Sequence, residues 1–443
     1  MRIFFCLNYF LPWQVAGTEI YCLQLAKYLQ KEGHDIKVLI PNYGKNSNDT
    51  YTYEGIRVIK FAEPSIVDRD LIMRRKQPRG VSAFTRILKE ERPELIHFHN
   101  VGGSNGVGIH HVRAAAALSL KILFTFHISG YTCSTGTLHF KNEVRCDGYI
   151  DPLRCTTCIY TSKNINSSKQ KVLAVLATTF YSLGYNSRRW DNALGTALGF
   201  PFMIKELKKD LEELTWLGAG IIVLTDWYKK VLELNGVPAN KLFKITQGLP
   251  GNNSGGEHPT DNEQKIFKLI YIGRITESKG LHLLTEAVKK CDADAISLSI
   301  YGTPAEEDYF QELKAATVLN KNIHWKGSIE PKEVIAEISR HDCLCVPSII
   351  CEMSPLVIQE AFSVKVPVLA SDVYGNAEQI EDGKNGWLFK FNDCNDLKEK
   401  IAYLMQNPGA LQEARKNIGA VKSFETVGEE HHVIYKQILQ KIT

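Results

Sequence analysis

Short apolar runs alternate with helical patterns along almost the whole chain, and this alternation constrains the fold more than any single motif. Each run is typical of a buried strand, and the segment after it carries apolar residues at helical spacing. Strands that alternate with helices predict parallel sheets covered by helices, the α/β class. A chain of 443 residues is too long for one ordinary core, so two domains are expected.

The predicted strands fall into two groups, one in each half of the chain. The first group comprises Arg2–Leu7, Asp35–Ile40, Arg57–Phe61, Leu95–Phe98, Lys121–Phe126, Gly220–Leu224 and Leu242–Thr246. The second group comprises Phe267–Ile272, Ile296–Tyr301, Ile323–Trp325, Cys343–Val346, Pro367–Ala370 and Trp387–Phe389. Between them, the segment Pro250-Gly251-Asn252-Asn253-Ser254-Gly255-Gly256 is typical of a linker. We therefore expect domains at 1–250 and 265–424, a linker at 251–264 and a last helical segment at 425–443.

Composition excludes several classes of protein. The chain has 44% hydrophobic and 23% charged residues, typical of a soluble globular protein, and a net charge of +4 that does not indicate nucleic-acid binding. It has no uncharged apolar stretch of about 18 residues that could span a membrane. The apolar segment Met1–Trp13 is interrupted by Asn8 and predicts a buried strand rather than a signal peptide. The eleven cysteines are therefore expected to be reduced thiols of a cytoplasmic protein.

Two carboxylates flank a predicted helix start in the segment Cys351-Glu352-Met353-Ser354-Pro355-Leu356-Val357-Ile358-Gln359-Glu360-Ala361. Ser354 suits the N-cap and Pro355 the first helical position. Glu352 then precedes the helix, and Glu360 lies about two turns into it. The free N–H groups and partial positive charge of a helix N-terminus favour a phosphate. The segment therefore fits a ligand with a polyhydroxylated end, a diphosphate and a second sugar.

Two cations lie at another strand-to-helix turn, in the segment Tyr271-Ile272-Gly273-Arg274-Ile275-Thr276-Glu277-Ser278-Lys279-Gly280. Arg274 and Lys279 follow the predicted strand Phe267–Ile272, and a helical pattern begins at Leu281. Such a position suits the neutralisation of a diphosphate. Alone, each of these charges would be interpreted as solvated surface charge, but their shared place at strand ends favours a binding site.

Together these segments resemble the donor-binding half of glycosyltransferase family 4, also called glycosyl transferases group 1. That family comprises retaining nucleotide-sugar transferases of GT-B architecture, with two Rossmann-like parallel-sheet domains facing a central cleft. Further matching segments, which extend the resemblance to most of the chain except about 160–215, are Ser371-Asp372, Glu378, Gly17-Thr18-Glu19, Ile96–His99 and Phe124–His127. The resemblance implies an N-terminal acceptor-binding domain, a C-terminal nucleotide-sugar-binding domain and a final helix that crosses back onto the first domain.

The resemblance also implies roles for the donor-binding residues. Glu352 is expected to contact hydroxyls of the donor sugar and Glu360 the ribose of the nucleotide. Leu356 and Val357 are expected to offer backbone N–H groups at the helix start, and Gly273 belongs to the same donor site.

The resemblance also assigns the reaction itself to four residues, His127, Arg274, Lys279 and Glu352. The two fixed cations are expected to stabilise the charge that develops on the departing nucleoside diphosphate. This effect could replace a metal, and the resemblance implies that catalysis requires no metal or other cofactor. It also implies front-face attack, in which the leaving phosphate helps to deprotonate the acceptor.

In the first half, single residues carry weaker signals. Gly17 permits close approach of the backbone to a phosphate, although Ala16 stands where the family usually has another glycine. A simple tight turn is the alternative. His127 follows an apolar strand and matches the family histidine beside the donor sugar, whereas a lone histidine is more often a packed residue. His97 and His99 alternate on a strand end, and His99 is the better candidate to face the cleft.

Four cysteines, Cys133, Cys146, Cys155 and Cys158, lie in an insert expected at 128–215. The Cys155-x2-Cys158 pair has the spacing of zinc ligands, and similar cysteines follow the histidine in one branch of the family. A structural zinc site is one interpretation. A disulfide or unligated thiols are together the favoured alternative.

The segment Ser162–Lys209 combines apolar side chains with cations. The apolar residues are Val172, Leu173, Val175, Leu176, Phe180, Leu183, Trp190, Leu198, Phe200 and Phe202, and the cations are Lys169, Lys171, Arg188, Arg189 and Lys205. Such a mixture can lie on an anionic membrane or contact a lipid-linked acceptor. Helices packed on the first domain with a solvated basic face are the alternative.

The sequence therefore predicts a retaining glycosyltransferase that moves a sugar from a nucleoside-diphosphate donor to a glycan or lipid-linked acceptor. By resemblance, surface polysaccharide biosynthesis at the inner face of the cell membrane is the expected setting. Alternatives are a sugar-nucleotide epimerase or phosphorylase of the same architecture, and a non-catalytic sugar-nucleotide sensor or scaffold. A zinc-dependent nucleic-acid binder would need a basic stripe, which the chain lacks.

Overall fold

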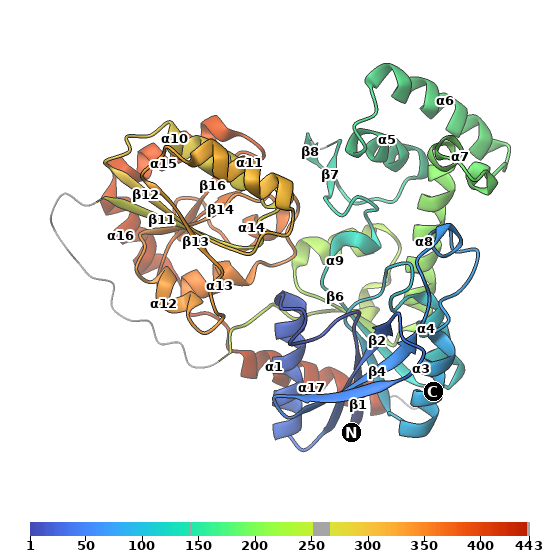
Figure 1. Cartoon of the computed structure of the whole chain (residues 1–443). Helices are drawn as coiled ribbons and strands as arrows, with labels where there is room; N and C mark the ends of the chain where they lie inside the picture. Colours follow the sequence, from blue (N-terminus) through green and yellow to red (C-terminus); the bar gives the residue numbers. More distant parts are fainter. Residues whose placement is uncertain (142, 251–265, 441–443) are drawn as a thin grey trace. The chain divides into compact units, whose positions relative to one another are not determined.

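The computed structural model describes residues 1–141, 143–250 and 266–440, which form two compact units (Figure 1). The first comprises Met1–Thr246 with Phe424–Thr443, and the second Gln247–Ser423. The second unit begins a few residues before the expected boundary because Leu249 pairs with Ser423 and donates its N–H to the carbonyl of Lys422 at 3.0 Å. The linker expected at 251–264 lies outside the described residues.

The first unit is built on two sheets and the helices around them. Its strands are β1 (Arg2–Cys6), β2 (Asp35–Tyr43), β3 (Asp49–Tyr53), β4 (Ile56–Glu63), β5 (Leu95–Phe98), β6 (Lys121–Phe126), β7 (His139–Phe140), β8 (Val144–Arg145), β9 (Gly220–Val223) and β10 (Leu242–Lys244). Its helices are α1 (Gly17–Lys31), α2 (Arg69–Ile72), α3 (Val81–Glu91), α4 (Ile109–Ala117), η1 (Ser129–Tyr131), α5 (Pro152–Ser162), α6 (Ser167–Ser182), η2 (Ser187–Arg189), α7 (Ala193–Leu198), α8 (Phe200–Leu217), α9 (Asp226–Leu234), η3 (Ala239–Lys241) and α17 (Phe424–Gln440).

The main sheet of this unit has the strand order β10-β9-β6-β5-β1-β2-β4-β3, and every pairing except β3 with β4 is parallel. The predicted parallel sheet is therefore confirmed. The antiparallel edge strand β3 was not predicted, because its residues are half-exposed and polar. Glu54 and Gly55, both with positive φ, form the tight turn between β3 and β4. This dipeptide was the one sequence feature that could have indicated a β-hairpin here.

Helix α17 belongs to the first unit and packs along α1 (Figure 1). Gly428 permits the contact, since a Cβ there would lie 2.3 Å from Cγ of Tyr28. Val427 and Tyr435 are fully buried in the same core cluster as α1. The C-terminal segment thus completes the core of the unit that contains the N-terminus.

The second unit has one six-stranded parallel sheet between layers of helices. Its strands are β11 (Phe267–Ile272), β12 (Ile296–Tyr301), β13 (Ile323–Gly327), β14 (Cys343–Val346), β15 (Val368–Ser371) and β16 (Gly386–Phe389). Its helices are η4 (Glu277–Lys279), α10 (Leu281–Lys289), α11 (Glu307–Thr317), α12 (Val334–Ile338), α13 (Leu356–Ser363), α14 (Tyr374–Ala377), α15 (Cys394–Gln406) and α16 (Pro408–Asn417). Separate core clusters on the two faces bury the strands on both sides, which explains their continuous apolar sequences.

The strand order of this sheet, β13-β12-β11-β14-β15-β16, is the doubly wound order, with its reversal between β11 and β14. Ligands of such sheets bind outside the carboxyl ends of the strands at this reversal. The order therefore directs attention to the segments that follow β11 and β14.

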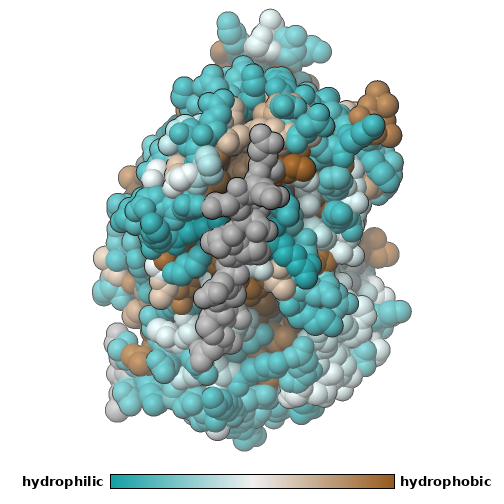
Figure 2. All heavy atoms as spheres, turned by 90° about the vertical axis from the view of Figure 1, so that its left-hand side faces the viewer, coloured by the Kyte–Doolittle hydropathy of each residue, from teal (hydrophilic) through white to brown (hydrophobic). Residues whose placement is uncertain are grey.

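The molecular surface gives two further facts. On the face shown in Figure 2, hydrophilic residues predominate and hydrophobic residues form small separate patches, as on most water-exposed surfaces. Among the described residues, no helix combines the length and apolar character that crossing a membrane requires.

Candidate functional site

In the second unit, the structure brings the predicted cations and the first carboxylate to the strand-order reversal. Gly273 and Arg274 follow β11, and Glu352 lies in the loop after β14, the direct neighbour of β11. Lys279 ends the short helix η4 between β11 and α10. The two segments that sequence reasoning selected separately are therefore one site.

Lys279 and Glu352 form a close ion pair in this site. The Lys279 Nζ donates to Glu352 Oε1 at 2.5 Å, and Ser348 Oγ donates to the same oxygen at 2.6 Å. The two charged side chains are 24% and 14% exposed, so each is shielded yet accessible. Burial raises the pKa of Glu352, but the charge of Lys279 and the hydrogen bonds from Lys279 and Ser348 outweigh it and keep the pKa below its ordinary value. Glu352 is therefore ionised at neutral pH and accepts hydrogen bonds.

Arg274 supplies a second positive charge, in a more exposed position than that of Lys279. Its side chain is exposed, and its charge also lowers the pKa of Glu352. Its backbone carbonyl accepts a hydrogen bond from the hydroxyl of Tyr271 at 2.8 Å, which fixes the turn after β11. Within the described ranges, the Arg274 guanidinium forms no ion pair, so its charge is available to a ligand.

Two glycines that sequence reasoning missed hold these segments together. Gly280 has φ +68°, and a Cβ there would lie 1.9 Å from the carbonyl oxygen of Pro347. A Cβ on Gly375 would lie 1.9 Å from the carbonyl oxygen of Glu352. Only glycine permits both approaches. The loop that carries Glu352 is thus clamped between the start of α10 and the start of α14.

Hydrogen bonds from the end of β15 fix the same loop. The hydroxyl of Ser371 donates to the carbonyl of Ser348 at 2.6 Å, and Asn376 Nδ2 donates to the carbonyl of Ser371 at 3.1 Å. Ser348 in turn contacts Glu352. Sequence reasoning included Ser371 in a matching segment but missed Ser348, whose only signal was its position four residues before Glu352.

Helix α13 differs from the prediction at its first residues. It begins at Leu356 with Pro355 as N-cap, so placing Ser354 at the N-cap and Pro355 in the first helical position was wrong by one residue. Pro355 has ψ 120°, which is extended rather than helical. Leu356 and Val357 are still the first helical residues, and their N–H groups are free of partners within the helix.

Glu360 lies in α13 and is half-buried. Burial raises its pKa to about 7, and this is the sole cause of the shift. A carboxylate with this pKa is only partly ionised at neutral pH. The two glutamates of the segment therefore differ: Glu352 is held in the charged form, whereas Glu360 can be neutral.

In the first unit, the predicted residues also gather at the carboxyl edge of the sheet. Gly17 is the first residue of α1, after the extended N-cap Ala16, and α1 follows β1. His127 directly follows β6 and is partly exposed. Its Nε2 lies 3.2 Å from Nδ1 of His99, and the ring of Tyr21 on α1 packs edge-on against it. Burial, followed by the charge of His431, lowers the pKa of His127 to about 3, so its imidazole is neutral.

His99 and His97 are buried rather than exposed at the strand end. His99 is only 1% exposed, so it is not an accessible side chain as expected. Instead it is buried and contacts His127 through its Nδ1. His97 contacts the hydroxyl of Tyr435 at 2.7 Å and that of Thr125 at 2.8 Å. Helix α17 thus contributes to the polar network beneath His127, a contribution that the distant sequence position of Tyr435 concealed.

The insert is helical over much of its length. Helix α5 packs against α8, and α6 packs against α5, α7 and α8. Helix α6 nevertheless leaves Val172, Val175 and Leu176 exposed, at one-turn spacing on a single face. Arg188, one of the predicted cations, is buried instead and donates to Glu206 at 2.6 Å. The insert therefore combines internal packing with an apolar exposed face.

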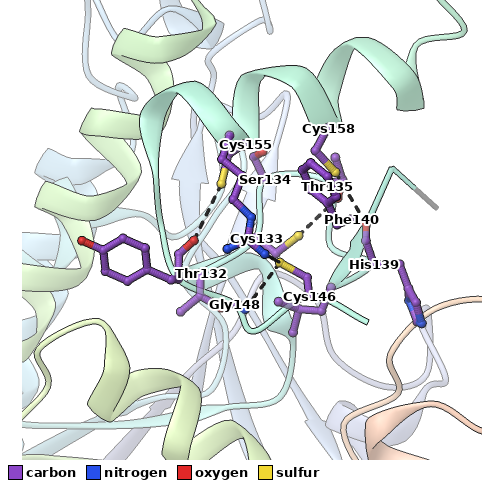
Figure 3. Close-up of a pocket in the computed structure, with 13 residues that line it drawn as sticks. Thr132, Cys133, Ser134, Thr135, His139, Phe140, Cys146, Gly148, Cys155 and Cys158 are labelled. Atoms are coloured by element: carbon purple, nitrogen blue, oxygen red, sulfur yellow. Dashed lines mark hydrogen bonds between the residues drawn. The ribbon is translucent and has the colours of Figure 1, made fainter. Parts of the chain in front are cut away.

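The four cysteines of the insert line one cavity and carry free thiols. Figure 3 shows their side chains around the same small space, with the ring of His139 directed away from it. Burial raises the pKa of Cys155 to about 12, and the charges of Cys133, Cys146 and Cys158 as thiolates raise it too. The other three cysteines are thus near enough to oppose the ionisation of Cys155.

Two family models match the sequence. Residues 257–421 match the model described as Glycosyl transferases group 1, and residues 15–161 match the model described as Glycosyltransferase Family 4. The two matches contain all the candidate residues of the two sheet edges.

Curated relatives match parts of the chain. A poly(ribitol-phosphate) alpha-N-acetylglucosaminyltransferase of Staphylococcus aureus is 29% identical over 221 residues, which cover 48% of this chain and 42% of that protein. WcaL, a putative colanic acid biosynthesis glycosyltransferase of Salmonella typhimurium, is 25% identical over 250 residues, covering 54% and 58%. The chain thus spans about half the length of the curated relatives it matches.

Solved structures match the whole chain. HepE of Anabaena, determined in complex with UDP and glucose, matches with a TM-score of 0.64 at 14% identity, covering 98% of this chain and 99% of that one. A sucrose-phosphate synthase of Thermosynechococcus elongatus matches with a TM-score of 0.66 at 17% identity, covering 99% and 98%. At these identities the likeness shows the fold, and it confirms the predicted architecture of two Rossmann-like domains.

Proposed function

We propose that this chain, which belongs to the group 1 and family 4 glycosyltransferases of GT-B architecture, moves a sugar from a nucleoside-diphosphate donor to a hydroxyl of a glycan or lipid-linked acceptor. The observation that supports this most directly is the Lys279–Glu352 pair at the strand-order reversal. A cation suits a diphosphate, and an ionised carboxylate suits sugar hydroxyls. The named relatives favour polysaccharide biosynthesis as the setting.

The proposed reaction retains the configuration of the sugar and uses no metal. As the diphosphate leaves, Lys279 and Arg274 stabilise its growing negative charge. Glu352 stays ionised, but its ion pair with Lys279 and the hydrogen bond from Ser348 occupy one of its oxygens, which makes it a weak nucleophile that still accepts hydrogen bonds from sugar hydroxyls. The acceptor hydroxyl then attacks the same face of the sugar, and its proton passes to the leaving phosphate. By resemblance, neutral His127 is assigned to the transferred sugar.

For the acceptor, we propose peripheral contact with a membrane through α6. Its exposed Val172, Val175 and Leu176 form an apolar stripe, and Lys169 and Lys171 on the same helix are exposed cations. Apolar insertion combined with cations suits an anionic lipid surface. This contact would present a lipid-linked acceptor to the enzyme.

The test is nucleoside diphosphate release across a panel of UDP-, GDP- and ADP-sugars, with and without anionic vesicles that contain a membrane lipid extract. We expect release from one donor, stimulated by the extract. Interconversion of the sugar with the diphosphate still attached would indicate an epimerase instead. Donor binding without release under every acceptor condition would contradict transfer and support a non-catalytic sugar-nucleotide-binding protein.

The pKa of Glu360 predicts a pH dependence of donor affinity. Ribose hydroxyls favour the ionised carboxylate, so binding lowers a pKa that is about 7 in the free protein. Affinity should therefore fall as the pH drops below 7, by up to about tenfold per unit. Glu360→Gln should bind more weakly at pH 8 and show little pH dependence.

Isothermal titration with the nucleotide sugar between pH 6 and pH 8 measures this effect. A nucleotide sugar is the right probe because its diphosphate, esterified at both ends, does not titrate in this range. Glu286→Gln, in α10, is the matched control and should behave like the wild type. A wild-type affinity that stays constant over this range would contradict the assignment of Glu360 to the ribose.

A further inference from the structure

The segment Cys133–Cys158 has little regular secondary structure before α5. It begins soon after His127 and contains the two-residue strands β7 and β8 before reaching α5. By contrast, Cys6, Cys22, Cys343, Cys345 and Cys351 are buried cysteines elsewhere in the chain. The four cysteines of this segment are partly exposed and line the same cavity, which apolar packing does not explain.

The cavity that these cysteines line is large enough for a single atom or ion. Its volume is about 20 Å³, which is enough for one water-sized body but not for an organic ligand. Cys133 approaches it from the turn after η1, Cys146 from the turn after β8, and Cys155 and Cys158 from successive turns of α5. Three separate parts of the segment therefore meet at this point.

Several donors are directed at the sulfur atoms. The backbone N–H of Gly148 donates to Cys146 Sγ and that of Lys141 to Cys158 Sγ, both at 3.4 Å. Arg154 Nη2 donates to Cys146 Sγ at 3.5 Å. Such donors stabilise thiolates, as the outer shell of a metal site does. The positive φ of Gly148 is what turns its N–H back toward the sulfur two residues earlier.

We propose that Cys133, Cys146, Cys155 and Cys158 bind one zinc ion as four thiolates and that the ion holds together the segment following His127. Zinc prefers a closed tetrahedron of four sulfurs in structural sites, with Zn–S distances of about 2.3 Å. Binding releases the four thiol protons. The resulting double negative charge is faced by the N–H donors of Lys141 and Gly148 and by the Arg154 guanidinium, which also pairs with Asp147 at 2.9 Å. The ion is not part of the transfer reaction, so this proposal does not depend on the proposed function.

Ligation requires all four thiols to exchange weak contacts for the ion. Cys133 Sγ lies 3.2 Å from Thr135 Oγ1, and Cys146 Sγ donates to Asp147 Oδ1 at 3.7 Å. In the structure, Cys155 Sγ contacts the carbonyl of Tyr149 at 3.9 Å, and Cys158 Sγ contacts that of His139 at 3.5 Å. Both are long contacts of a weak donor, so turning toward the cavity costs little. Zinc ligation then replaces them with four strong bonds and links β8, α5 and the turn after η1.

The test is elemental analysis of the whole chain, purified without a metal-binding tag. We expect one zinc per chain in the wild type and almost none in the Cys155→Ser/Cys158→Ser variant. Cys291→Ser and Cys394→Ser, outside the segment, should keep the full amount. Cobalt(II) substituted for zinc should show the visible spectrum of a tetrahedral thiolate site, and this measurement needs no variant that folds poorly.

Three outcomes would overturn the proposal. One is a metal-free chain whose four cysteines are all free or disulfide-bonded after denaturing alkylation. Another is iron with acid-labile sulfide in place of zinc. The third is zinc that persists in Cys155→Ser/Cys158→Ser but is lost in Cys22→Ser, because Cys22, His99 and His127 also have ligand atoms within 4.8 Å of one another.

Discussion

Replacing Lys279 with methionine should lower the turnover of sugar transfer by about 10²–10³-fold, as loss of a group that stabilises developing charge does. The affinity for free nucleoside diphosphate should also fall, by about tenfold or more, because a charged hydrogen bond to the phosphate is lost. The corresponding nucleoside, which has no diphosphate, should bind as it does to the wild type. Steady-state kinetics and binding measured by ligand-observed NMR check the two effects.

The same replacement leaves Glu352 without its cation. Burial then acts on its carboxyl group with only Ser348 and Arg274 to oppose it, so its pKa should rise in the variant. Lys289→Met is the matched control, because Lys289 also pairs with a glutamate, Glu286, at 2.7 Å on the same unit. An unchanged affinity for nucleoside diphosphate in Lys279→Met would show that this lysine does not hold the diphosphate.

The strands could be predicted because parallel strands buried on both faces have continuous apolar sequences. All four residues of β14, β15, β5 and β9 are buried. Edge strand β3 has no such signal, because none of its residues is buried and the strand is held by its pairing with β4. Strand order could not be read from the sequence either. The doubly wound order that makes β11 and β14 neighbours is a property of the assembled sheet.

The charged residues of the site could be predicted because they follow strands, and strand ends meet at one edge of a parallel sheet. The residues that position these charged side chains could not be predicted from the sequence. Gly280 and Gly375 matter through backbone approaches to Pro347 and Glu352, which are contacts between segments far apart in sequence. The contact of Tyr435 with His97 joins residues 338 positions apart. Periodicity and capping rules describe local structure, so they carry no information about such contacts.

Glu352→Gln should lower turnover as Lys279→Met does, but it should differ from that variant in its affinity for nucleoside diphosphate. Turnover should fall by about 10²–10³-fold, because the amide no longer supplies the charged acceptor for sugar hydroxyls as the sugar becomes cationic in the transition state. Affinity for free nucleoside diphosphate should be unchanged or higher, because Lys279 loses a competing carboxylate. Kinetics and diphosphate binding, measured on both variants together, therefore separate the sugar end of the donor site from its phosphate end.

The stability of Glu352→Gln provides an independent check on the ion pair. The folded-state pKa of Glu352 is lowered, so its contribution to stability is present above the unfolded pKa of about 4.3 and is lost as pH falls through the folded value. The variant should thus be less stable than the wild type at pH 7, by about 1–3 kcal/mol, and the difference should shrink in acid. Glu286→Gln, whose carboxylate is 47% exposed, should show a much smaller loss. Equal losses of stability in Glu352→Gln and Glu286→Gln, measured by urea unfolding, would contradict a stabilising ion pair at Glu352. Loss of diphosphate binding in Glu352→Gln would place this residue at the phosphate instead of the sugar.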